Sequence, residues 1–221
     1  MHHYFTHYGL GEKRIVIHAD NCSGQNKNNA MIKYLMWRIE NGLHNKITYS
    51  FMVAGHTKFS PDGFFGLFKL KLRNSEVENL EDLVKVVEKS SIEGYNTAQT
   101  IFNGSGTREV HFYKWTEFLN QFYNNIKDIS KQHHFSLSAD NIGVIELKHE
   151  INGDMTTINI MKKDKPSVIS SFPKEIVAKG LSAERQWYLY EQIREHVHDP
   201  SKKDEFCYKP QVPKPTTDKI L

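Results

Sequence analysis

Two acidic residues follow apolar stretches of the chain, in places where a carboxylate can take part in chemistry. Asp20 comes directly after the apolar run 13–19, and Asp62 lies 42 positions later, after a second apolar run over 46–54. Ligands of open α/β sheets bind outside the carboxyl ends of the strands, so we expect both carboxylates near one edge of a parallel sheet. Carboxylate oxygens suit Mg²⁺ or Mn²⁺, and a pair of metal ions can activate a nucleophile and stabilise the leaving oxygen of a phosphodiester. The two aspartates therefore predict a divalent-metal site that acts on phosphodiesters.

Several neutral polar side chains near these aspartates are candidates for binding a substrate or orienting a water. They are His18, Asn21, Gln25, Asn29 and His56. Plainer roles stay open beside these. Asp20 can close a turn or cap the following helix, because Asx side chains bond their own backbone. Asp62, after Pro61, can serve as a helix-start residue, and His56 can be an ordinary loop histidine.

The composition suits a soluble globular protein and excludes several classes of site. Of 221 residues, 38% are hydrophobic and 25% are charged, and the net charge of +3 permits a nucleic-acid partner without arguing for one. Two cysteines, Cys22 and Cys207, are too few for a disulfide framework or a four-cysteine zinc site. We expect an intracellular location, with the nucleus as one option. No apolar run approaches the roughly 18 residues that span a membrane, so we expect no membrane partner.

The periodicity of apolar residues predicts a strand–helix–strand unit early in the chain. Residues 13–19 form a short β-branched run typical of a buried strand, and a polar turn follows over 21–28. Apolar residues then recur at three- and four-residue spacing over 29–40, which predicts a helix, and residues 46–54 alternate as in a second strand. This βαβ pattern is expected to be right-handed if its strands are parallel.

The remaining sequence predicts mostly helices, with one hairpin. The expected elements are helices over 62–73 and 77–89, a short strand over 110–113, a helix over 115–126, a hairpin that joins 144–147 to 157–160 through Asn152-Gly153, a helix over 182–197 and an extended Pro-rich tail.

Three segments carry a resemblance to a known class of proteins. They are residues 18–28 (HADNCSGQNKN), 55–66 (GHTKFSPDGFFG) and 180–190 (GLSAERQWYLY). Together they resemble an uncharacterised family of transposon-derived proteins, whose members are similar to the catalytic core of D-D-E/D transposases and integrases with the ribonuclease H-like fold. The resemblance spans about residues 13–215.

The resemblance implies an α/β fold: a partial ribonuclease H-like sheet flanked by helices, with a C-terminal hairpin and helix. We divide the chain into a lead-in (1–12), the incomplete core (13–130), the hairpin and helix extension (131–208) and the tail (209–221). Asp20 would then be the second acid of the catalytic triad and Asp62 the third. The first acid would lie on an earlier strand, where Glu12 is the only acidic residue here. We therefore expect this chain to be the C-terminal part of a longer core.

Two functions follow from these expectations. The first is metal-dependent cleavage or strand transfer of DNA by the full-length form, with Asp20 and Asp62 holding Mg²⁺ or Mn²⁺ and with activity impaired in this chain. The alternative is a non-catalytic DNA- or protein-binding module derived from a transposase.

Overall fold

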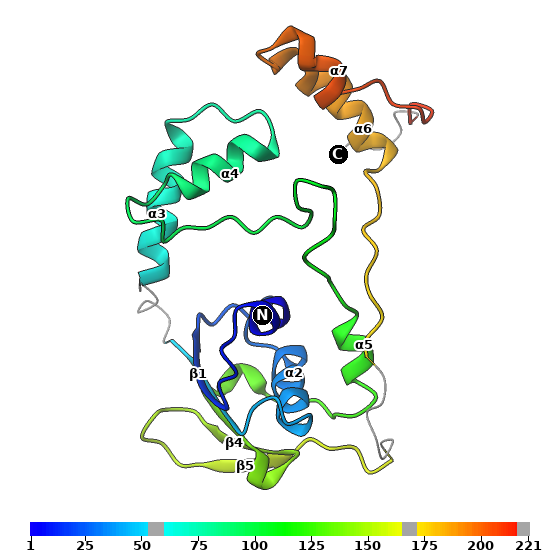
Figure 1. The fold of residues 1–221 in the computed structure, drawn as a ribbon. Helices are drawn as coiled ribbons and strands as arrows, with labels where there is room; N and C mark the ends of the chain where they lie inside the picture. The colour runs from blue at the N-terminus through cyan, green and yellow to red at the C-terminus, as the bar shows by residue number, and fades with distance from the viewer. Residues whose placement is uncertain (53–59, 165–171, 216–221) are drawn as a thin grey trace. The chain divides into compact units, whose positions relative to one another are not determined.

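A computed structural model describes residues 1–52, 60–164 and 172–215 of the chain. The contacts divide the chain into two units, each built from two stretches: residues 1–58 with 101–176, and residues 59–100 with 177–221. The principal elements of the first unit are α1 (His2–His7), β1 (Arg14–Ala19), α2 (Asn29–Glu40), β2 (Lys46–Phe51), α5 (Trp115–Leu119), β3 (His134–Ser138), β4 (Val144–Lys148) and β5 (Thr156–Asn159). Figure 1 labels most of these elements.

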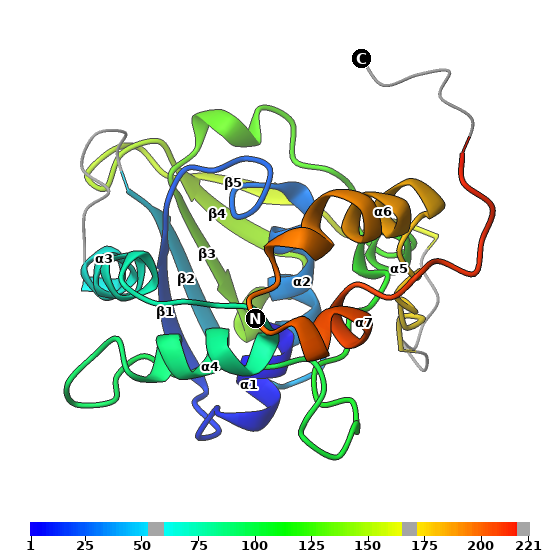
Figure 2. The same cartoon turned by 90° about the horizontal axis from the view of Figure 1, so that it is seen from above.

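A mixed sheet of five strands forms the centre of the first unit, with the order β1-β2-β3-β4-β5 (Figure 2). β1 pairs in parallel with β2, and each later neighbour pairs antiparallel. The carboxyl ends of β1 and β2 therefore lie at the same end of the sheet as the start of β3. β1 is an edge strand that pairs only with β2 among the described residues.

Helix α2 covers one face of this sheet and forms the core with it. It packs against β2, β3 and α5. Asn28 begins the helix as its N-cap, because its side-chain oxygen accepts the N–H of Met31 at 2.9 Å. The residues of the helix and sheet that are fully buried include Ile32, Leu35, Met36, Ile47, Tyr49, Phe135, Leu137 and Ile145. Because only this face of the sheet is buried in the core, apolar and polar residues alternate along the strands.

The opposite face of the sheet is polar. His18, Ser50, His134 and Lys148 lie in one row across β1 to β4, since each is in register with its neighbour. Ser50 is buried, and its Oγ lies 3.0 Å from Nδ1 of His134.

The second unit consists of helices and turns. Its elements are α3 (Ser60–Arg73), α4 (Leu80–Glu88), α6 (Ala183–Tyr188), π-helical and 3₁₀ turns over Leu189–Ile193 and Arg194–His196, a 3₁₀ turn over Pro200–Lys202, and α7 (Lys203–Phe206). α3 packs against α4. The backbone N–H of His198 donates to Glu78, which ties the C-terminal helical turns to the segment before α4.

The predicted strand–helix–strand unit is confirmed by β1, α2 and β2, and the hairpin by β4 and β5. The predicted strand over 110–113 is wrong: Tyr113 makes only an isolated bridge to Glu175. The helix expected over 115–126 ends at Leu119, because the next residues turn to place Phe122 and Tyr123 in the core. The helix expected over 182–197 begins as predicted at the cap Ser182 but changes its winding after Tyr188.

Candidate functional site at the carboxyl end of β1

Asp20 directly follows β1, and its carboxylate is held by two donors on the same oxygen. The N–H of Cys22 donates to Oδ1 at 3.1 Å, and Nδ2 of Asn26 donates to the same Oδ1 at 2.6 Å. No described residue donates to Oδ2. The Asx turn that the sequence left open therefore exists, and it leaves one carboxylate oxygen of a half-buried aspartate without a donor.

The turn after Asp20 is compact because one backbone carbonyl accepts hydrogen bonds from three of its N–H groups. The backbone oxygen of Cys22 accepts from the N–H groups of Gln25, Asn26 and Lys27 at 3.2, 2.8 and 3.0 Å. The phenol of Tyr49 on β2 donates to the backbone oxygen of Asn26 at 3.1 Å. Asn26 is therefore fixed by its backbone to β2, and its side chain is fixed to Asp20.

A buried cation lies beside the same strand ends. Lys27 is only 4% exposed, and its Nζ donates to Oδ1 of Asn21 at 3.1 Å and lies 5.3 Å from the ring centre of Phe51. Nδ2 of Asn21 donates in turn to the backbone oxygen of Met52. Asn21 thus joins Lys27 to the end of β2, and the ammonium contacts an amide and an aromatic ring.

Burial and charge shift the titration of the groups around Asp20. Burial, as the larger cause, and the negative charge of Asp20 together raise the pKa of Tyr49 to about 12. Burial lowers the pKa of Lys27. Burial also lowers the pKa of His133, and the positive charge of Lys27 acts in the same direction. At neutral pH, the strand ends around Asp20 and Lys27 therefore carry Tyr49 as an uncharged phenol and His133 as an uncharged imidazole.

The other predicted contact residues of the first unit lie in three environments. His18 is exposed on the polar face of the sheet, away from α2. The side-chain amide of Gln25 is exposed and makes no hydrogen bond with any described residue. Asn29 is tied to the loop after α5, because its amide oxygen accepts from the N–H of Ile126 at 2.7 Å and its Nδ2 lies 3.4 Å from the oxygen of Ile126.

The structure does not place the predicted residues Asp62 and His56 at the site around Asp20. Asp62 lies in the first turn of α3, which agrees with the helix-start role, and it belongs to the second unit, whereas Asp20 belongs to the first. His56 lies outside the described residues. Convergence of Asp20 and Asp62 on one metal ion stays a prediction.

Sequence reasoning passed over three residues that build this site: Asn26, Lys27 and Tyr49. A signal for Asn26 and Lys27 was present, because both lie in an unusually polar turn directly after a strand. Tyr49 carried no such signal, because its hydroxyl reaches Asn26 across 23 positions of sequence.

The donor set fits a hard divalent cation only in part. Asp20 offers one carboxylate oxygen, and Mg²⁺ commonly binds through one or two carboxylates while it keeps several waters or phosphate oxygens. Within the described parts of the chain, no three His, Cys, Asp or Glu side chains gather around a common point. Asp20 is therefore the residue of this unit that would hold such an ion.

The fold and site define an α/β protein with an open mixed sheet and an oriented aspartate at the end of its edge strand. The chain belongs to the family described as "Domain of unknown function (DUF7869)", which matches residues 10–153. That match includes β1 to β4, α2 and the whole turn after Asp20. Neither a curated protein nor a solved structure matches the chain significantly. Among the described helices, none has the length and apolarity needed to cross a membrane.

Proposed function

We propose that this chain is a transposase-derived domain whose full-length form cleaves or joins phosphodiesters of DNA with Mg²⁺ or Mn²⁺. One observation carries the proposal: Asp20 is oriented at the carboxyl end of β1 by two donors on Oδ1, which leaves Oδ2 for a cation. The resemblance to the ribonuclease H-like class supports it and adds Asp62 as a second ligand. The outer edge of β1, which pairs with no other strand among the described residues, supports it too, since a further strand that carries another acid can pair there.

The residues of the chain have separable tasks in this proposal. When bound, the cation would polarise a phosphoryl oxygen and acidify a bound water. Asp20 binds the ion through Oδ2, while Asn26 and the N–H of Cys22 fix the carboxylate through Oδ1. Lys27 adds a positive charge that attracts the phosphate, and Asn21 holds this ammonium in place.

Isothermal titration with Mn²⁺ tests the proposal. We expect saturable binding by the native chain and a loss of at least about tenfold in affinity in Asp20→Asn, because an amide oxygen replaces an anionic ligand. Asp128→Asn is the matched control. Asp128 is an exposed aspartate of the same unit with φ of 53°, a backbone conformation that asparagine adopts readily.

Asp62→Asn decides whether the second unit contributes to the same site. Loss of binding in both Asp20→Asn and Asp62→Asn would show that the two carboxylates serve one ion. Absence of saturable binding, or binding that Asp20→Asn leaves intact, would contradict the proposed chemistry.

The buried ammonium of Lys27 favours a second candidate, a module that binds nucleic acid without cutting it. A fixed positive charge in the same turn attracts phosphate and opposes a divalent cation. We expect Lys27→Met, which keeps the volume of the side chain, to weaken binding of a fluorescein-labelled DNA duplex in EDTA by roughly fivefold, the equivalent of about 1 kcal/mol. Fluorescence anisotropy measures this affinity. If Lys27→Met binds the duplex as tightly as the native chain does, this candidate loses its support.

A further inference from the structure

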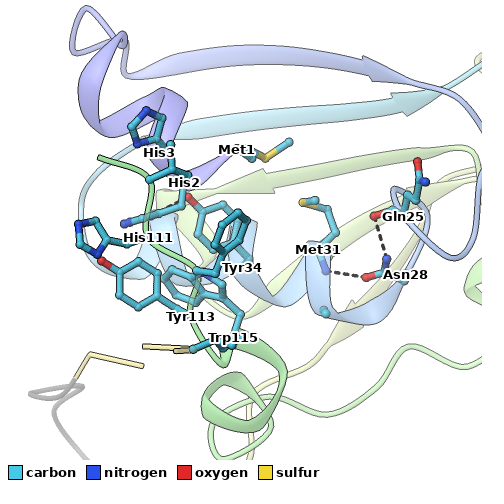
Figure 3. Close-up of a pocket in the computed structure, with 14 residues that line it drawn as sticks. Met1, His2, His3, Gln25, Asn28, Met31, Tyr34, His111, Tyr113 and Trp115 are labelled. Atoms are coloured by element: carbon cyan, nitrogen blue, oxygen red, sulfur yellow. Dashed lines mark hydrogen bonds between the residues drawn. The ribbon is translucent and has the colours of Figure 1, made fainter. Parts of the chain in front are cut away.

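A cavity of about 400 Å³ opens beside the N-terminal end of α2, within the first unit (Figure 3). Its walls come from α1, from the polar turn with the first residues of α2, and from the segment 110–115. Its volume lies in the range of sites that bind small molecules. Among the described residues, its lining includes no Asp, Glu, Lys or Arg side chain. The cavity is therefore suited to a neutral group.

Aromatic rings gather at one end of this cavity. The rings of His2 and Tyr34 lie 5.1 and 4.8 Å from the ring of Trp115, and that of Tyr113 lies 6.1 Å away. The Tyr34 hydroxyl accepts from Arg38 at 3.0 Å and lies 3.1 Å from Nδ1 of His2. These contacts hold the rings in place. The ring of Phe172 also packs against Tyr113 and Trp115, with ring centres 4.9 and 5.5 Å apart. Tyr113 and Trp115 are only partly buried, so each keeps some surface for a ligand.

The other end of the cavity carries two amide side chains (Figure 3). The amide of Asn28 is already engaged: its oxygen caps α2 through Met31, and its nitrogen donates to the backbone oxygen of Gln25 at 3.1 Å. The side-chain amide of Gln25 makes no hydrogen bond with a described residue. Gln25 therefore offers both a donor and an acceptor beside a cavity lined with rings.

The polar turn joins this cavity to the candidate site at Asp20. Gln25 precedes Asn26, whose side chain holds the carboxylate of Asp20 at 2.6 Å. Under the proposed function, a ligand that spans this cavity and Asp20 needs a flat group for the rings, hydrogen-bonding edges for Gln25 and a phosphate near Asp20. Nucleic-acid bases combine these features, and they stack on aromatic side chains once they leave the helical stack.

We propose that this cavity receives an unstacked base of a single-stranded segment, with Tyr113 and Trp115 as the stacking surface and Gln25 as the contact to the base edge. The inference rests on the proposed function, because it places the backbone of the same strand at Asp20. Beyond the proposed function, the inference predicts that the chain prefers single-stranded nucleic acid that carries its bases over the same backbone without bases.

Binding of single-stranded DNA octamers in EDTA tests this inference without a metal ion. One fluorescein-labelled octamer carries adenine at all positions, and the other has the same backbone with abasic residues. Stacking contributes about 1–3 kcal/mol per base, so we expect the adenine octamer to bind the native chain about 5- to 150-fold more tightly. Competition with the mononucleotide dAMP shows whether a free nucleotide fills the cavity or whether the strand is needed.

Two variants and one control locate the base. Tyr113→Leu and Gln25→Ala should each reduce the preference for adenine over the abasic octamer at least threefold. Gln25 is exposed and leaves the core unchanged. Tyr188→Leu removes a 45%-exposed tyrosine of the second unit and should leave the preference as it is.

The outcomes separate this inference from the proposed function. Equal affinity for both octamers, no binding of either, or a preference that Tyr113→Leu and Gln25→Ala both retain would overturn it. Asp20→Asn should keep the preference for adenine. Absence of saturable Mn²⁺ binding by the native chain, together with a preference for adenine, would therefore contradict only the metal chemistry. Saturable Mn²⁺ binding without a preference for adenine would contradict only the base cavity.

Discussion

Lowering the pH from 7 to 4 should destabilise the first unit by up to about 3 kcal/mol through His44 alone. His44 is 2% exposed, and its Nδ1 accepts the Nε–H of Arg38 at 3.1 Å. A guanidinium only donates, so this contact requires an unprotonated Nδ1. Burial, as the largest cause, and the positive charges of Arg38 and Lys13 together lower the pKa of His44 from 6.5 to about 4, against a smaller opposing effect of Glu12.

The direction of the pH effect follows from this shift. The unfolded chain protonates His44 near pH 6.5, whereas the folded chain does so only near pH 4. The stability that depends on neutral His44 is complete above pH 6.5 and is lost as the pH falls from 6.5 through 4, by about 1.4 kcal/mol per pKa unit. His2 titrates in the same window, because burial also lowers its pKa to about 4.

Urea denaturation between pH 7.5 and 4, followed by tryptophan fluorescence, measures the effect. His44→Asn is the comparison, because its Oδ1 can accept from Arg38 and does not titrate. The native chain should lose stability relative to His44→Asn as the pH falls. Parallel loss in both proteins would show that His44 is not the titrating group.

The contacts of α2 show where prediction from the sequence stops. Apolar spacing located the helix and its buried stripe, because that signal depends only on residues within one segment. The same pattern would place Lys33 and Arg38 toward solvent, yet they are 3% and 6% exposed. Nζ of Lys33 donates to Asn120 and Asn125, both at 2.6 Å. These partners lie about ninety positions away, so only the folded chain reveals why a charge can be buried there.

Strand β3 was missed for a related reason. Its five residues contain two buried apolar side chains, Phe135 and Leu137, and such a short alternation is weak evidence for a strand. Pairing with β2 and β4 supplies the stability that the segment lacks alone. α1 (His2–His7) was missed as well, since it buries no residue and shows no apolar stripe. At the candidate site, Asp20 was predictable from its place after a strand, whereas the support of Asn26 by Tyr49 depended on tertiary structure.

Replacing Asn26 by alanine should weaken Mn²⁺ binding by about 10- to 100-fold, although Asn26 does not touch the ion in the proposed site. Its Nδ2 donates to Oδ1 of Asp20 at 2.6 Å, and loss of such a partner of a metal-binding group typically has an effect of this size. The variant keeps the backbone oxygen that accepts from Tyr49, so the turn stays attached to β2. Calorimetric titration with Mn²⁺ measures the affinity, and urea denaturation measures stability.

Asn28→Ala separates positioning of the carboxylate from general support of the fold. Asn28 caps α2 through the N–H of Met31, so its loss should cost about 1 kcal/mol of stability and leave Mn²⁺ affinity nearly unchanged. Asn26→Ala should show the reverse pattern, with a large change in Mn²⁺ affinity and a small one in stability. Such a pair of results would assign Asn26 to the orientation of Asp20. Equal Mn²⁺ affinity in Asn26→Ala and the native chain would mean that the hydrogen bond at Oδ1 serves the turn alone.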